Sequence, residues 1–77
     1  MKVGDIFTVL PTNGFEKRWW GSFAILEEIQ HHTLSGGRTL TLYQLRTHKR
    51  NGYGEELVHT TWLFNDFELK EFFKEVT

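Results

Sequence analysis

The chain has 77 residues, which is enough for one domain, and it contains no cysteine, which excludes a disulfide framework and a thiolate metal site. Nine Lys and Arg residues against ten Asp and Glu residues give a formal net charge of −1. This balance excludes a polycation of the histone-tail kind and a nucleic-acid mimic built on massed carboxylates. Hydrophobic residues make up 39% of the chain and aromatic residues 16%, which is typical of a folded protein.

The first half of the chain predicts two strands joined by a basic loop. A strand over about residues 3–10 ends at Pro11, because proline cannot donate to a strand ladder. A polar, basic loop follows over residues 12–21, and a second strand over about residues 22–33. The apolar alternation along this second strand slips at Glu27–Glu28, which predicts a bulge or a sharp bend.

Two turns then separate two further strands. Gly36 and Gly37 can supply the positive φ angles of a tight hairpin, and a strand over about residues 38–47 follows them. The pair Asn51–Gly52 is the strongest hairpin signal in the chain. It predicts a turn before a fourth strand over about residues 55–64.

The last segment has a different period and predicts a helix over about residues 66–76. Asn65 is suited to the N-cap, and Glu68 three residues later has the spacing of a capping box. A helix this short does not stand alone in water, so we expect its apolar stripe to cap the open end of the sheet. The stripe has helical spacing and consists of Leu69, Phe72, Phe73 and Val76.

These elements predict a mainly β fold, a small meander β-barrel of four to five strands with one C-terminal α-helix. A long strand that bends at a bulge can serve two sheets, which is how small barrels close. The opening segment Val3–Phe7 resembles the first strand of SH3-like barrels, so the barrel is expected to be SH3-like or related. The alternative is a sheet with both faces partly covered. A superfold of this kind implies no single function.

The near-neutral total charge hides a division along the chain. Residues 1–52 carry seven Lys and Arg against four Asp and Glu, a net charge of +3. Residues 53–77 carry two Lys against six Asp and Glu, a net charge of −4. A locally charged surface is therefore compatible with the overall balance.

A meander places its first and third connections at the same end of the sheet, so the two basic connections should meet there. The first carries Lys17, Arg18, Trp19 and Trp20. The third carries Arg46, His48, Lys49, Arg50 and Tyr53. We expect these nine residues to form a binding surface, with one of the two tryptophans pointing inward because adjacent strand residues face opposite sides.

Cations beside aromatic rings suit single-stranded nucleic acid, because the cations neutralise phosphates and the rings stack on bases. The first functional hypothesis is therefore a binding module for single-stranded nucleic acid or a nucleoprotein. Trp, Tyr and Arg also dominate protein interfaces, so the alternative is a protein-binding inhibitor or adaptor of the phage or mobile-element type. A weaker alternative is sequestration of a small anionic ligand such as a nucleotide.

Catalytic and metal-site patterns are absent from the sequence, which predicts a protein without enzymatic activity, cofactor or metal. His31 and His32 are adjacent, so in a strand they point to opposite faces and cannot ligate one ion together. We expect Glu27 to pair with Arg46 or Lys49 as a surface ion pair of little energetic weight. No segment approaches the roughly 20 apolar residues that span a bilayer, so a cytoplasmic protein without membrane contact is expected.

Overall fold

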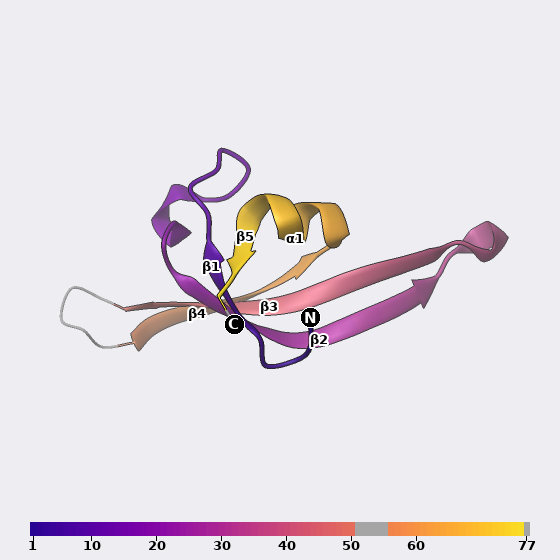
Figure 1. Ribbon diagram of the computed structural model, residues 1–77, viewed down its shortest axis with the longest axis horizontal. Coiled ribbons are helices and arrows are strands. Elements are labelled where there is room, and N and C mark those ends of the chain that lie inside the picture. The colour runs from indigo at the N-terminus through magenta and orange to yellow at the C-terminus, as the bar shows by residue number, and fades with distance from the viewer. Residues whose placement is uncertain (51–55, 77) are drawn as a thin grey trace.

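The computed structural model describes residues 1–50 and 56–76, and for residues 49, 50 and 56–59 it describes the backbone alone. The five strands form one antiparallel sheet in the order β4-β3-β2-β1-β5 (Figure 1). The predicted mainly β fold with one helix near the C-terminus is confirmed. In chain order the elements are β1 (Ile6–Val9), the 3₁₀-helix η1 (Lys17–Trp19), β2 (Phe23–Thr33), η2 (Ser35–Gly37), β3 (Thr39–Arg50), β4 (Glu56–Phe64), α1 (Asp66–Phe72) and β5 (Phe73–Glu75).

The sheet is open, so the SH3-like barrel predicted from the sequence is not confirmed. β4 and β5 lie at opposite edges, and within the described ranges no pairing joins them. The cause is the path of the chain after β4. α1 crosses one face of the sheet, and β5 then pairs with β1 at the far edge (Figure 1). That face is covered by helical segments instead of by the second half of a barrel.

A bulge interrupts the pairing of the two longest strands, β2 and β3. Their register shifts between Leu26 and Glu28, so Glu27 is the extra residue and the predicted bulge is confirmed. β2 lies close to its predicted bounds, whereas β3 continues to Arg50, past the predicted end at residue 47. Because of the bulge, both Leu26 and Ile29 lie on the side of the sheet that α1 covers.

The first strand is shorter than the predicted span of residues 3–10. Gly4 has a φ of 97°, and a tight turn precedes the strand. The Asp5 N–H donates to the Lys2 carbonyl oxygen at 3.1 Å, and the Asp5 carboxylate accepts from the Lys2 N–H at 2.8 Å. This hydrogen bond from Lys2 is also the main cause of the lowered pKa of the Asp5 carboxyl group. The turn delays regular pairing until Ile6.

The hydrophobic core lies on the face of the sheet that α1 and η1 cover (Figure 1). Phe15, in the loop before η1, is its centre. Its ring lies 4.9 Å from the ring of Trp62 and within 5.8 Å of three phenylalanine rings. One aromatic cluster therefore fastens the loop, β4 and α1 to the sheet. The buried hydrophobic residues are Phe7, Val9, Phe15, Trp19, Ala24, Leu26, Leu45, Phe64, Leu69, Phe72 and Phe73.

The C-terminal helix begins as predicted and ends early. Asn65 Oδ1 accepts from the Glu68 N–H at 2.8 Å, and Glu68 Oε1 accepts from the Asn65 N–H at 3.1 Å, so the predicted capping box is confirmed. The prediction of helix as far as residue 76 is wrong, because α1 ends at Phe72 and Phe73 begins β5. Phe73 pairs with Val9 along the edge of β1 that β2 leaves open. Its ring is buried against those of Phe7, Phe15 and Phe64.

β2 and β3 extend well past their neighbours. In the described part of the chain, residues 30–33 and 39–42 pair only with one another, and they form a protruding two-stranded segment that we call the β arm (Figure 1). η2 closes the β arm at its tip, where Gly36 and Gly37 adopt the positive φ angles expected of the turn. The chain as a whole measures 51 × 25 × 20 Å.

Candidate functional site

The strand registers place the two basic connections at the same end of the sheet. Thr8 of β1 pairs with Phe23 of β2, and Phe23 pairs with His48 of β3. The loop before Phe23 and the chain after His48 therefore leave the sheet at one end. Among the nine residues of the predicted surface, Tyr53 lies outside the described residues, and only the backbone of Lys49 and Arg50 is described.

The described members of the predicted surface divide between the two faces of the sheet. Leu45 and Thr47 are buried in the core, so the alternating residues Arg46 and His48 lie on the opposite side. Trp19 is buried in the core and belongs to the covered side, together with the rest of η1. The end of the sheet is shared, but the sheet itself separates Lys17 and Arg18 of η1 from Arg46 of β3.

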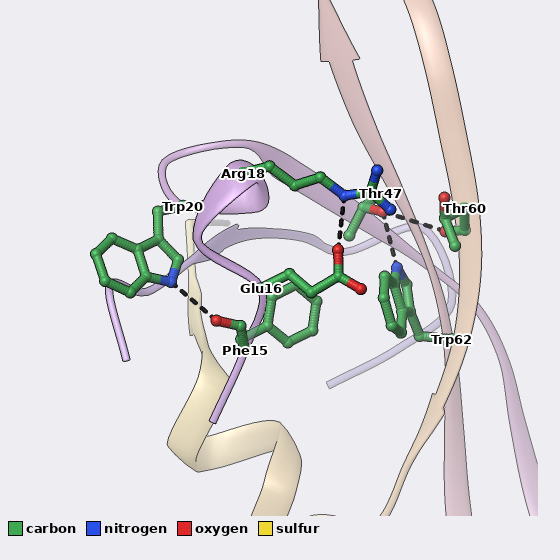
Figure 2. A network of polar contacts seen from close by, with 7 residues as sticks. All are labelled: Phe15, Glu16, Arg18, Trp20, Thr47, Thr60 and Trp62. Atoms are coloured by element: carbon green, nitrogen blue, oxygen red, sulfur yellow. Dashed lines mark hydrogen bonds and ion pairs between the residues drawn. The ribbon is translucent and has the colours of Figure 1, made fainter. Parts of the chain in front are cut away.

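On the covered side, the basic residues of η1 have partners of their own. Arg18 Nε lies 2.6 Å from Glu16 Oε2 (Figure 2), and both side chains are more than half exposed. The Arg18 guanidinium lies 5.4 Å from the centre of the Trp19 ring, and Lys17 Nζ lies 5.9 Å from that of Trp20. These contacts place the Lys17 and Arg18 side chains over the tryptophan rings. Basic residues in surface loops without a binding role commonly make the same contacts.

The two tryptophans of the basic loop have different environments. Trp19 is 1% exposed, which confirms that one of the pair points inward and removes its ring from any stacking role. Its Nε1 has no hydrogen-bond partner among the side chains and backbone groups that the structure describes. Trp20 is half-buried, and its Nε1 donates to the Phe15 carbonyl oxygen at 3.2 Å (Figure 2). Only Trp20 offers part of an aromatic surface here.

Within residues 1–50 and 56–76, no helix lies over the side of the sheet opposite the core, since α1 and η1 both lie on the core side (Figure 1). Strand alternation places apolar and polar side chains together on this side. Phe23 is 43% exposed and Leu63 is 51% exposed, although both are large apolar residues. We call this surface the uncovered face and define it by Ile6, Phe23, Ile25, Arg46, His48 and Leu63.

Polar contacts order the uncovered face. The ring of His48 stacks on that of Phe23, with centroids 5.0 Å apart and planes inclined by 7°. Arg46 Nε lies 3.2 Å from Glu27 Oε2, in line with the predicted ion pair, although its N–H points too far aside for a hydrogen bond. Gln44 Nε2 donates to Glu27 Oε1 at 3.4 Å. The bulge at Glu27 thus brings a carboxylate to the basic residue of this face.

The histidines of the β arm have separate partners. His31 Nδ1 lies 3.4 Å from Thr41 Oγ1, and His32 Nε2 lies 3.0 Å from Gln30 Oε1. Their strand positions direct them to opposite faces, as predicted from their adjacency. Throughout the described part of the chain, no group of three His, Asp or Glu side chains is arranged to hold a metal ion.

Comparison of the chain with protein-family models, curated proteins and solved structures finds no significant match. None of the helices in the described ranges is long and apolar enough to cross a membrane. The functional argument therefore depends on the geometry of the molecule.

Sequence reasoning missed Phe23 and Leu63 as surface residues. Both are large and apolar, so composition alone assigns them to the core. Their positions relative to Ala24 and Phe64 contain the missing signal, because each is the strand neighbour of a buried residue and must face the other way. That signal becomes readable only when the covered side of the sheet is known.

Proposed function

We propose that this chain is a non-enzymatic protein-binding module that docks a partner protein on the uncovered face. The observation that carries the proposal is the exposure of Phe23 and Leu63 on a sheet face without a helix over it. Large apolar side chains grouped on the surface of a small protein are a usual sign of an interaction site. The half-buried Ile25 follows Phe23 on this side of β2, and Ile6 of β1 pairs with Ile25, so both extend the apolar surface beside Phe23. Leu63 lies two strands away on β4, opposite Gln44 of β3.

The chemistry of the face suits a protein interface. Phe23 is an aromatic anchor, and the stacked His48 ring limits its freedom, so little side-chain entropy is lost when a partner covers it. Arg46 adds an arginine, a residue type enriched at interface hot spots. Its partner Glu27 balances the charge, so a neutral and largely apolar partner surface fits as well as a charged one.

Binding of single-stranded nucleic acid is the second candidate, and the shared end of the two basic connections favours it. Against it, Arg18 and Arg46 each lie beside a carboxylate, and the Trp19 ring is buried. A cation that already lies beside a carboxylate neutralises phosphate less well and displaces fewer counterions from the nucleic acid. The affinity expected for nucleic acid is therefore lower. The apolar character of the uncovered face makes the protein partner the better supported of the two.

The experiment compares captured proteins between matched variants. Phe23→Glu places a charge on the uncovered face, whereas Phe67→Glu changes a phenylalanine that is 74% exposed on α1, away from that face. Each immobilised variant is exposed to a nuclease-treated lysate of the source cells, and the captured protein is purified and titrated by calorimetry. We expect the unchanged chain and Phe67→Glu to bind this protein with equal affinity and Phe23→Glu to bind at least about tenfold more weakly.

Two results would contradict this function. Equal binding by all three chains would place the partner elsewhere on the molecule. Loss of every captured partner after nuclease treatment, together with oligonucleotide binding in fluorescence anisotropy at low salt, would favour the nucleic-acid function instead. Thermal unfolding of each variant verifies that the folded state is retained.

A further inference from the structure

We propose that the free edge of β4 pairs with the same edge of a second copy of this chain, and that the two sheets become one. β4 is an edge strand, because among the described strands only β3 pairs with it. It spans nine residues, Glu56–Phe64, whereas β5 at the other edge spans three. Alternate residues of an edge strand point their N–H and C=O groups outward, so β4 presents the longer row of unpaired main-chain groups.

Residues 58–64 of β4 lack the devices that usually protect an edge strand, whereas the charge of Glu56 and a bulge lie at the start of the strand. Segment 56–64 contains no proline, lysine or arginine. The register shift with β3 lies between Lys49 and Arg50, at the start of β4, and pairing is regular from Val58 to Phe64. α1 packs over the core face and does not pair with the outer edge of β4. The regularly paired part of this edge, residues 58–64, is therefore a template for another strand.

A second copy is the occupant that the pattern of β4 fits best. The pairing has a two-fold axis perpendicular to the sheet, midway between Thr61 and Thr61 of the second copy. The two threonines then lie opposite each other, and Trp62 lies opposite Thr60 of the second copy. In this register opposite residues lie on the same face, as antiparallel pairing demands. Residues 58–64 contain no Asp, Glu, Lys or Arg, so no like charges are brought together in this register. Threonine pairs across antiparallel strands are themselves favourable.

The symmetry has a consequence for the docking surface. An axis perpendicular to the sheet keeps both copies of α1 on one side and both uncovered faces on the other. The dimer would then present two uncovered faces side by side. The pairing does not depend on what binds the uncovered face, so it goes beyond the proposed function and can fail separately from it.

Crosslinking tests the contact directly, because the chain has no cysteine of its own. Thr61→Cys introduces one thiol at an exposed position of β4, and the matched control Thr39→Cys introduces one at an exposed threonine of β3 within the β arm. A short bis-maleimide reagent should link most of the Thr61→Cys protein into dimers and leave Thr39→Cys monomeric. Equal crosslinking of both variants, or of neither, would overturn the proposal.

Sedimentation velocity over a concentration series gives the second test. The unchanged chain and Thr39→Lys should sediment as dimers, and Thr61→Lys should raise the dimer dissociation constant by about tenfold or more, because lysine opposes edge pairing. A monomeric unchanged chain, or a dimer unaffected by Thr61→Lys, would overturn the proposal. Dissociation by Phe23→Glu alone would also overturn it, since the second copy would then occupy the uncovered face. Thr61 lies opposite Arg46 on the uncovered face, so Phe23→Glu separates the two proposals: it should lose partner capture and still sediment as a dimer.

Discussion

Trp62 Nε1 donates a 2.9 Å hydrogen bond to Oγ1 of Thr47, a side chain that is completely buried (Figure 2). The Thr47 hydroxyl in turn donates to the Thr60 carbonyl oxygen at 3.2 Å. A single hydroxyl group therefore satisfies an indole N–H and is itself satisfied, in a place where an unpaired polar group is costly. It joins the aromatic core to the pairing of β3 with β4.

Thr47→Val tests how much this hydroxyl group contributes to the free energy of unfolding. Valine has a similar shape but cannot accept from Trp62 Nε1, so the free energy of unfolding should fall by about 1–3 kcal/mol. Urea denaturation monitored by far-ultraviolet circular dichroism measures the change. Thr39→Val, at an exposed position, is the control and should alter stability by less than about 0.5 kcal/mol. Equal effects of the two substitutions would show that the buried hydroxyl has no special role.

Gly14→Ala should destabilise the protein by overpacking. A Cβ at Gly14 would lie 2.3 Å from Cε1 of the Phe72 ring, so the buried ring would have to move. The expected loss is about 1–3 kcal/mol in the free energy of unfolding. A double-mutant cycle with Phe72→Leu measures the coupling, since the smaller side chain leaves room for the methyl group. Strictly additive losses in the double mutant would refute a steric origin.

Tyr43 should make the free energy of unfolding depend on pH in the alkaline range. Its hydroxyl donates to Asp66 Oδ1 at 2.5 Å, and this bond to a carboxylate raises the pKa of Tyr43 above its ordinary value of 10.0. The folded state therefore holds the phenolic proton more tightly than the unfolded state. The stabilisation is complete below the unfolded pKa and is lost as the pH rises through the folded pKa.

Tyr43→Phe provides the measurement of this pH dependence. At neutral pH the variant should be less stable by about 1 kcal/mol, at the modest end for a charged acceptor because Asp66 is exposed. The difference from the unchanged chain should shrink as the pH rises above 10.0. Denaturation series at neutral and alkaline pH measure it. A stability difference that stays constant or grows at alkaline pH would contradict the assigned direction of the pKa shift.

The capping box of α1 should be measurable in thermal unfolding. Asn65→Ala removes the acceptor for the Glu68 N–H and should cost about 1 kcal/mol. For a domain of this size that loss lowers the melting temperature by roughly 4–8 °C. Asn65→Asp keeps a side-chain oxygen at the N-cap and should melt close to the unchanged chain. If Asn65→Asp melts as low as Asn65→Ala, the hydrogen bond is not the source of the effect.

Local signals predicted the elements of this fold better than their assembly. Pro11, the glycine pair at Gly36–Gly37 and the cap at Asn65 act through their immediate neighbours, and the strands and the helix start follow from them. Barrel closure depends on which strand the chain joins last. The adjacent pair Phe72 and Phe73 illustrates the limit, because both fit a helical stripe, yet Phe73 gains a strand partner in Val9. Periodicity within one segment contains no information about that partner.

The sequence predicted the candidate site only in part, as it did the fold. Strand order placed Lys17 and His48 at one end of the sheet, as the registers bear out. The side of the sheet on which each residue lies was missed. That property depends on whether a residue neighbours a core position such as Thr47, and on the extra residue at Glu27 that reverses the alternation midway along β2. A pattern of residue types cannot supply either fact.

The β arm gives β2 and β3 two different environments along their length. Near Leu26 and Leu45 both strands are flanked and buried, and their amide protons should exchange with solvent only when the whole core opens. Toward Thr33 and Thr39 the same two strands have only each other and water, and an isolated two-stranded ribbon has little stability of its own. We expect the tip to fray and re-form many times during the lifetime of the folded core. Amide hydrogen exchange within this one hairpin would thus range from the slowest to the fastest in the protein. The change from slow to fast exchange should occur near Tyr43, which pairs with Phe64 at the end of β4.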